Sequence, residues 1–110
     1  MERIKRNLPY LRLLCKRPVN KDVRKHLLQS EELIKILSEI SLNILNGNIR
    51  ITEREKKRLR RYKTLMRLLA RKSVSLNKKR STLVNQKGGG FFLPLLAPLI
   101  TLISSAIAQS

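Results

Sequence analysis

Residues 30–48 read SEELIKILSEISLNILNGN and predict the central helix of the protein. Ser30 is a suitable N-cap, and the two glutamates after it suit the positive end of a helix dipole. Gly47 predicts the end of the helix, because a left-handed closing residue is most often Gly. The apolar residues recur at spacings of 4, 3 and 4, which places them on one buried face: Leu33, Leu37, Ile40 and Ile44.

A second helix is predicted to begin after Thr52. The sequence Thr52-Glu53-Arg54-Glu55 matches a capping box, in which the Thr hydroxyl accepts from the backbone of Glu55 and the Glu55 carboxylate reaches back to the cap. We expect one continuous helix from Glu53 to about Arg71. Its apolar face has spacings of 3, 4 and 3: Leu59, Tyr62, Met66 and Leu69.

Shorter amphipathic helices are predicted around these two. In the first, Pro9 is placed at the first helical position, and Ser73 or Ser75 begins the last one. No stretch alternates apolar and polar residues as a half-buried strand does. The predicted ranges are 8–16, 20–29 and 76–86. The sequence therefore predicts an all-α fold, a small bundle of four or five short helices with an uncharged hydrophobic C-terminal tail.

Charge is distributed unevenly along the chain. Lys and Arg number 25 against 7 acidic residues, a formal net charge of +18, and the last acidic residue is Glu55. Such an excess of positive charge predicts a polyanionic partner. Charge and composition divide the chain into a basic N-terminal arm with a short helix (1–19), a basic helical body (20–87), a glycine hinge (88–90) and a hydrophobic tail (91–110).

The basic residues after Glu55 are the candidate nucleic-acid-binding residues. On the predicted helix 53–71, five of them follow at spacings of 4, 3, 4 and 4, forming a ridge that we expect opposite the apolar face. Contacts with phosphates rather than bases are expected, since the Asn and Gln residues that read adenine are sparse here. An anionic membrane, another acidic partner or a merely solvated face are the alternatives. The candidates are Lys56, Lys57, Arg58, Arg60, Arg61, Lys63, Arg67, Arg71, Lys72, Lys78, Lys79, Arg80 and Lys87.

No catalytic, metal or cofactor site is expected. Cys15 is the single cysteine and His26 the single histidine, so neither a zinc cluster nor an intrachain disulfide is predicted. Cys15 is interpreted as a packed thiol, with a reactive or intermolecular thiol as the alternative. No nucleophile is paired with a base, and the charged start of the chain does not resemble a secretory signal. We therefore expect a non-enzymatic protein synthesised in the cytosol and not secreted.

The tail begins after Gly88-Gly89-Gly90 and carries no charge. Pro94 and Pro98 disfavour a spanning helix or a core strand, which remain the alternatives. We expect an extended first part and a helix from about Leu99, docking on a membrane interface or a protein groove such as a capsid. The predicted contact residues are Phe91, Phe92, Leu93, Leu95, Leu96, Leu99, Ile100, Leu102 and Ile103.

The junction between body and tail carries a resemblance. Gln86-Lys87-Gly88-Gly89, followed by Gly90-Phe91-Phe92-Leu93-Pro94-Leu95-Leu96-Ala97-Pro98-Leu99-Ile100, resembles the C-terminal part of the adenoviral core protein X (mu) precursor family. The likeness covers residues 86–103, and the helical body resembles more the small proteins of adenovirus-like elements of the Polinton/Maverick and adintovirus group.

This resemblance implies a virion core protein that condenses double-stranded DNA, located in the virion core and the host nucleus. It also implies a viral cysteine protease that cuts between Gly89 and Gly90, although Gln86 departs from the Met, Ile or Leu that such sites prefer. A second, weaker candidate site is Leu45-Asn46-Gly47-Asn48 before Ile49, which we interpret as a helix cap.

Three functional hypotheses follow. The first is a DNA-packaging core protein that neutralises phosphates without sequence preference, with viral capsid proteins, the protease or an anionic membrane as further partners. The second is a membrane-active protein with a lytic or entry role. The third is a cellular RNA-binding or ribonucleoprotein component. Each is a non-enzymatic role.

Overall fold

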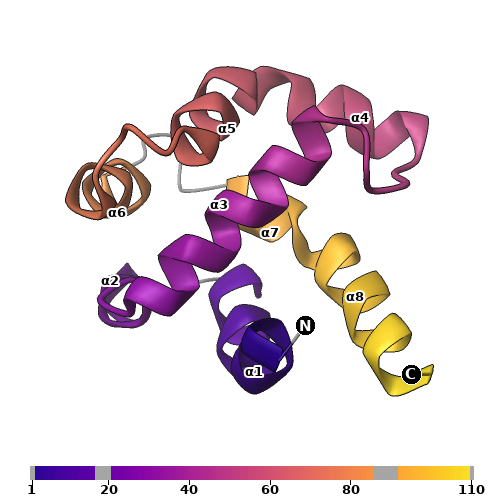
Figure 1. The fold of residues 1–110 in the computed structure, drawn as a ribbon, viewed down its shortest axis with the longest axis horizontal. Coiled ribbons are helices and arrows are strands. Elements are labelled where there is room, and N and C mark those ends of the chain that lie inside the picture. Colours follow the sequence, from indigo (N-terminus) through magenta and orange to yellow (C-terminus); the bar gives the residue numbers. More distant parts are fainter. Residues whose placement is uncertain (1, 17–20, 86–91, 110) are drawn as a thin grey trace.

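The structure, a computed structural model, describes residues 2–16, 21–85 and 92–109 (Figure 1). Most of these residues are helical, and none of them is in a strand. The all-α prediction is confirmed. In chain order the elements are α1 (Glu2–Cys15), α2 (Lys21–Leu27), α3 (Glu31–Leu45), α4 (Glu53–Leu59), the 3₁₀ turn η1 (Arg60–Tyr62), α5 (Lys63–Ala70), α6 (Leu76–Val84), α7 (Phe92–Leu95) and α8 (Ala97–Gln109).

Helix α3 is the central element, as its sequence predicts. The Ser30 hydroxyl accepts a hydrogen bond from the backbone N–H of Leu33 at 3.3 Å, and Gly47 follows the helix with a φ of 71°. Both predicted ends are therefore confirmed. One side of α3 packs against α5, and further contacts join it to α1 and α6 (Figure 1). Its buried residues therefore contact elements from before and after it in the chain.

The predicted helix 53–71 is not continuous. Its start is confirmed, because the Thr52 hydroxyl accepts from the backbone N–H of Glu55 at 3.1 Å. The α-helical pattern is then interrupted by η1, and α5 resumes it at Lys63. A 3₁₀ turn has about three residues per turn rather than 3.6, so it rotates every later side chain relative to an uninterrupted helix.

Helix α1 is longer than predicted. It begins at Glu2 instead of Leu8, and Pro9 lies inside it rather than at its start. Proline in a helix interior removes one hydrogen bond and usually interrupts the helix. Here the exposed Pro9 is tolerated in a helix whose opposite face is fully buried, with Leu11 and Leu14 at 0% exposure. Tertiary packing outweighs the local preference.

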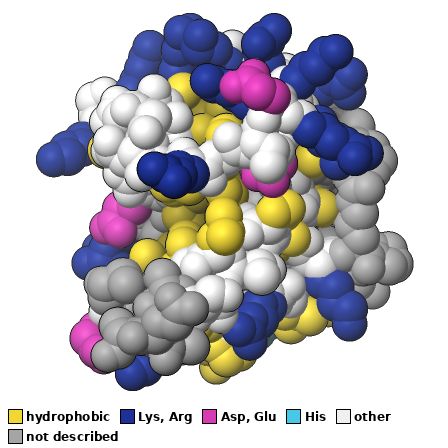
Figure 2. Space-filling view, turned by 90° about the vertical axis from the view of Figure 1, so that its right-hand side faces the viewer, with side chains coloured by type: hydrophobic (Ala, Val, Ile, Leu, Met, Phe, Trp, Pro, Cys, Tyr) yellow, Lys and Arg dark blue, Asp and Glu magenta, His cyan; other side chains and the backbone are white. Residues whose placement is uncertain are grey.

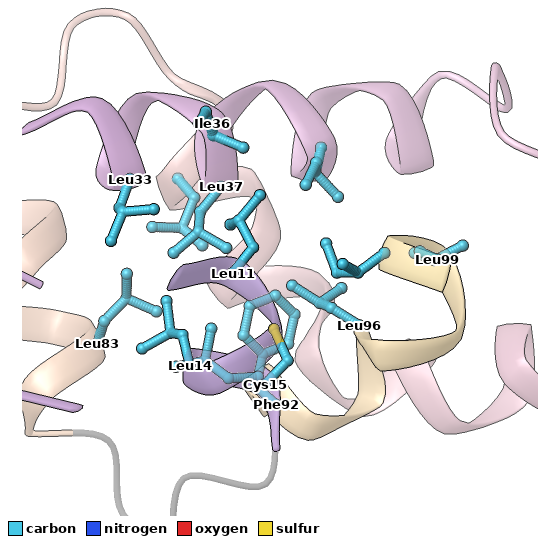
Figure 3. Packing of buried hydrophobic residues seen from close by; sticks show 14 of the residues in the cluster. Leu11, Leu14, Cys15, Leu33, Ile36, Leu37, Leu83, Phe92, Leu96 and Leu99 are labelled. Atoms are coloured by element: carbon cyan, nitrogen blue, oxygen red, sulfur yellow. The ribbon is translucent and has the colours of Figure 1, made fainter. Parts of the chain in front are cut away.

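The hydrophobic tail is part of the core, which corrects its interpretation as a separate contact segment. Helices α7 and α8 both pack on α1, and α7 also packs on α4. Figure 3 shows tail side chains sharing one interior with those of α1, α3 and α6. The tail residues buried there, each predicted to contact a membrane or capsid, are Phe92, Leu93, Leu96, Leu99 and Ile100.

The tail is also helical where an extended segment was expected. Pro94 lies within α7, and Pro98 is the second residue of α8. Proline is compatible with the first turn of a helix, because the N–H that it lacks has no intrahelical acceptor there. Leu95 and Ile103 are half-buried and Leu102 is exposed, whereas Phe91 lies outside the described residues. No helix in the described ranges is long and apolar enough to cross a membrane.

Candidate nucleic-acid interface

A run of exposed basic residues occupies the segment from α4 to α5. Figure 2 shows Lys and Arg side chains along the top of the face near α4, with apolar side chains exposed below them. Further exposed cations follow α5 and continue into α6. We call this set the cationic surface: Lys56, Lys57, Arg58, Arg60, Arg61, Lys63, Arg67, Arg71, Lys72 and Lys78. Arg54 adds an exposed cation that was not among the predicted residues, which all follow Glu55.

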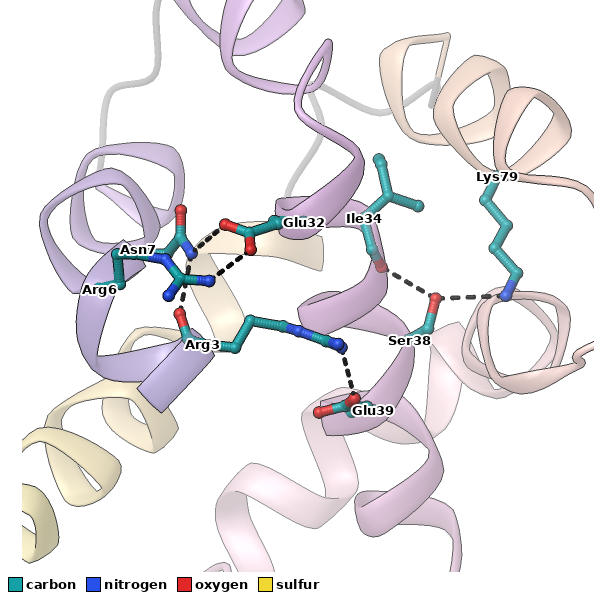
Figure 4. A network of polar contacts seen from close by, with 8 residues as sticks. All are labelled: Arg3, Arg6, Asn7, Glu32, Ile34, Ser38, Glu39 and Lys79. Atoms are coloured by element: carbon teal, nitrogen blue, oxygen red, sulfur yellow. Dashed lines mark hydrogen bonds and ion pairs between the residues drawn. The ribbon is translucent and has the colours of Figure 1, made fainter. Parts of the chain in front are cut away.

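Two acidic residues of α3 form ion pairs with α1. Arg3 contacts Glu39 at 3.0 Å and Arg6 contacts Glu32 at 2.5 Å, so both ion pairs between described residues join α1 to α3 (Figure 4). The Asn7 amide also donates to Glu32 at 2.9 Å. This hydrogen bond and the one from Arg6 lower the pKa of the Glu32 carboxyl. Neither carboxylate neutralises the cationic surface.

The ridge of cations does not lie opposite the apolar face, which corrects the prediction. Side chains three positions apart are separated by about 60° around a helix, so Lys56 and Lys63 stand beside Leu59 and Met66. The structure accordingly places Lys56, Arg60 and Lys63 at the rim of a groove of about 290 Å³. The floor of this groove is apolar and consists of Ile44, Leu45, Ile51, Leu59 and Met66.

Lys79 faces the interior, although its charge predicted phosphate binding. It is 6% exposed, and its Nζ donates to the Ser38 hydroxyl at 3.3 Å, which in turn donates to the Ile34 carbonyl at 2.9 Å (Figure 4). Burial lowers the pKa of the Lys79 amine. The sequence signal that was missed is the spacing of four from Leu83, which puts both on the inner face of α6.

Arg80 is likewise engaged inside the fold. Its Nε donates to the carbonyl of Leu28 at 2.7 Å, and its Nη2 to the carbonyl of Gln29 at 3.5 Å. These carbonyls follow the end of α2, where helix termini leave acceptors unsatisfied. A third bond runs from Nη1 to Asn77 at 2.7 Å. Arg80 therefore joins α6 to the end of α2 and is not a free phosphate ligand.

Several predicted site residues remain outside the described part of the chain: Lys87, Gly89 and Gly90. The weaker cleavage candidate around Gly47 lies at the end of α3, in the helix-capping position that the sequence indicated. In the described ranges, no group of His, Cys, Asp and Glu side chains is arranged to hold a metal ion. Cys15 is buried, and burial raises the pKa of its thiol to about 12.

Comparison with known proteins found no matching family model, no matching curated protein and no matching solved structure.

Proposed function

We propose that the protein binds the phosphate backbone of double-stranded DNA through the cationic surface and neutralises it without reading its sequence, as a DNA-packaging virion core protein does. The observation that carries this proposal is the row of exposed cations on α4 and α5, none of which is in an ion pair with another described residue. Like charges at helical spacing repel one another, and phosphates reverse that unfavourable term.

Double-stranded DNA is chosen over RNA on the resemblance of residues 86–103 to the adenoviral core protein X precursor family. The fold gives less support to a membrane-active role, because the tail side chains that would enter lipid fill the core instead. In this proposal the tail completes the interior on which the cationic segment rests. Location of the protein in a virion core and the host nucleus belongs to the same proposal.

The test is the salt dependence of binding to short mixed-sequence duplexes, measured by fluorescence anisotropy. With about 6 to 10 phosphate contacts, affinity falls by about 10³ to 10⁵ between about 50 and 200 mM salt. Replacing Lys56, Arg60, Lys63 and Arg67 by Gln lowers the slope of log affinity against log salt by about 3 to 4. Gln has nearly the helix propensity of Lys and Arg, so the fold is retained.

A matched control removes four exposed cations from α1, α2 and α3 instead: Lys5, Lys21, Lys25 and Lys35, each changed to Gln. Its slope stays close to that of the wild type if the cationic surface is the binding site. An equal loss of slope in both variants means that net charge alone drives binding and contradicts the proposed site. Tighter binding to duplex or single-stranded RNA than to DNA contradicts the choice of DNA.

A further inference from the structure

The groove between the end of α3 and the α4–α5 segment combines an apolar floor with a basic rim. Leu59 and Met66 are buried at its base, whereas Ile44, Leu45 and Ile51 are half-buried and keep part of their surface in water. Covering half-buried aliphatic side chains is favourable in proportion to the area removed from water. The floor therefore favours a ligand with apolar groups.

The rim adds a requirement for more than one negative charge. Lys56, Arg60 and Lys63 line the same groove, and none of them is in an ion pair with another described residue. They are four and three positions apart, so their charges repel one another along one side of the segment. Carboxylates placed between them would relieve this repulsion.

We propose that this groove binds a protein segment in which apolar anchors are flanked by Asp and Glu, and that this segment competes with DNA. A single fatty acid supplies one carboxylate to three cations. Duplex DNA supplies many charges but no aliphatic side chain to cover the floor. A second copy of this chain is disfavoured by its net charge of +18. An acidic segment with apolar anchors satisfies both the floor and the rim.

Competition follows from the shared cations. Lys56, Arg60 and Lys63 belong to the cationic surface as well as to the groove. A carboxylate and a phosphate cannot occupy the same position, so the bound segment displaces DNA from this part of the surface. The competition rests on the proposed function, whereas binding in the groove does not. Such a partner would control when the protein loads onto DNA or leaves it.

The test uses a fluorescein-labelled peptide, Asp-Asp-Phe-Glu-Leu-Leu-Glu-Asp, and a peptide of equal charge in which Phe and Leu are replaced by Ser. The wild-type protein binds the first peptide about tenfold more tightly than the second, because only the first covers the floor. Equal affinities mean that charge alone attracts the peptides and overturn the proposal. Tighter binding of laurate than of the first peptide overturns the choice of a protein segment.

Two variants of α3 locate the binding. Leu45→Ser changes a groove residue, and Leu42→Ser makes the same change at an exposed residue of the same helix that does not line the groove. Leu45→Ser weakens the first peptide by about fivefold and leaves DNA binding unchanged, whereas Leu42→Ser affects neither. Equal effects of the two substitutions overturn the assignment to the groove. Circular dichroism verifies that both variants are folded.

Displacement of DNA is measured separately, by titrating the first peptide into the protein bound to labelled duplex. The peptide releases DNA, and the Ser-substituted peptide does so only at about tenfold higher concentration. Peptide preference without any DNA binding leaves the groove in place and contradicts the proposed function. Salt-dependent DNA binding without peptide preference supports the proposed function and contradicts the groove as a peptide site.

Discussion

The ring of Phe92 packs against the ring of Tyr62, with their centroids 5.6 Å apart and their planes inclined at 50°. Tyr62 closes the 3₁₀ turn in the middle of the cationic segment, and Phe92 is the first residue of α7. A second link runs from the guanidinium of Arg12 in α1 to the hydroxyl of Ser104 in α8. The contact between Phe92 and Tyr62 thus joins the uncharged tail to the cationic segment, and the exposed hydrogen bond from Arg12 joins the tail to α1.

Phe92→Ala tests this support. Phe92 is 0% exposed, so its truncation leaves a cavity and removes the contact with Tyr62. We expect a loss of about 3 to 5 kcal/mol of unfolding free energy, measured by urea denaturation. The matched control is Leu102→Ala, at a 53% exposed position of α8, which changes stability by less than about 0.5 kcal/mol. Similar losses in the two variants would show that the tail does not pack as described.

Glu32→Gln tests the junction between α1 and α3. Hydrogen bonds from Asn7 and Arg6 lower the pKa of Glu32 below its ordinary value of 4.5. The Glu32 carboxylate therefore stabilises the fold at pH values above its ordinary pKa. This contribution disappears as pH falls through the lowered pKa. We expect the wild type to lose stability more steeply than Glu32→Gln between neutral and acidic pH. Urea midpoints across this range measure the difference.

Glu31→Gln is the control for this experiment. Glu31 shares the first turn of α3 with Glu32, so the two substitutions remove a similar interaction with the helix dipole. Unlike Glu32, Glu31 is exposed. A pH profile of Glu31→Gln that differs from the wild type as much as that of Glu32→Gln would assign the effect to the dipole rather than to Asn7 and Arg6.

Lys78 and Lys79 are adjacent in sequence but differ in burial, and Met substitutions should separate them. Lys78→Met removes an exposed cation and lowers the salt slope of DNA binding by about 0.9, whereas Lys79→Met leaves the slope unchanged. Salt titrations of DNA binding measure both. A reduction of the slope by Lys79→Met as large as that by Lys78→Met would place Lys79 at the DNA surface and contradict its burial.

Stability gives a second contrast at Lys79. Because burial lowers its pKa, the unfolded state binds more protons between the folded and unfolded pKa values, and the unfolding free energy rises with pH there. The charged amine is therefore unfavourable at neutral pH, and Lys79→Met should be at least as stable as the wild type. A large loss of stability would instead assign the dominant role to the hydrogen bond with Ser38.

Cys15 should be unreactive in the folded protein. It is buried, and burial raises the pKa of its thiol to about 12, so the thiolate that reacts with alkylating reagents is scarce at neutral pH. We expect iodoacetamide to label Cys15 in urea and not in its absence, as measured by mass spectrometry. Rapid labelling without urea would contradict its position in the core.

Local signals predicted the elements with side-chain caps. Ser30, Thr52 and Ser75 each accept a hydrogen bond from a backbone N–H three residues later, which depends only on neighbouring residues. Pro9 was predicted at the start of a helix but lies inside one, and the 3₁₀ turn at Arg60–Tyr62 was not predicted. Both depend on what the opposite face of each helix packs against. The described candidate cations are exposed as predicted except for Lys79 and Arg80, which are engaged inside the fold. These two were assigned by charge alone.

The sequence by itself determined the all-α class, the capped starts of α3 and α4, and the accumulation of positive charge after Glu55, because periodicity, capping and charge are local properties of the chain. Only the tertiary structure decided that the uncharged C-terminal segment is core and that the cationic ridge borders an apolar groove. Both depend on contacts between segments far apart in sequence. Apolar side chains become buried wherever a partner face is available, and a local sequence pattern does not indicate which face that is.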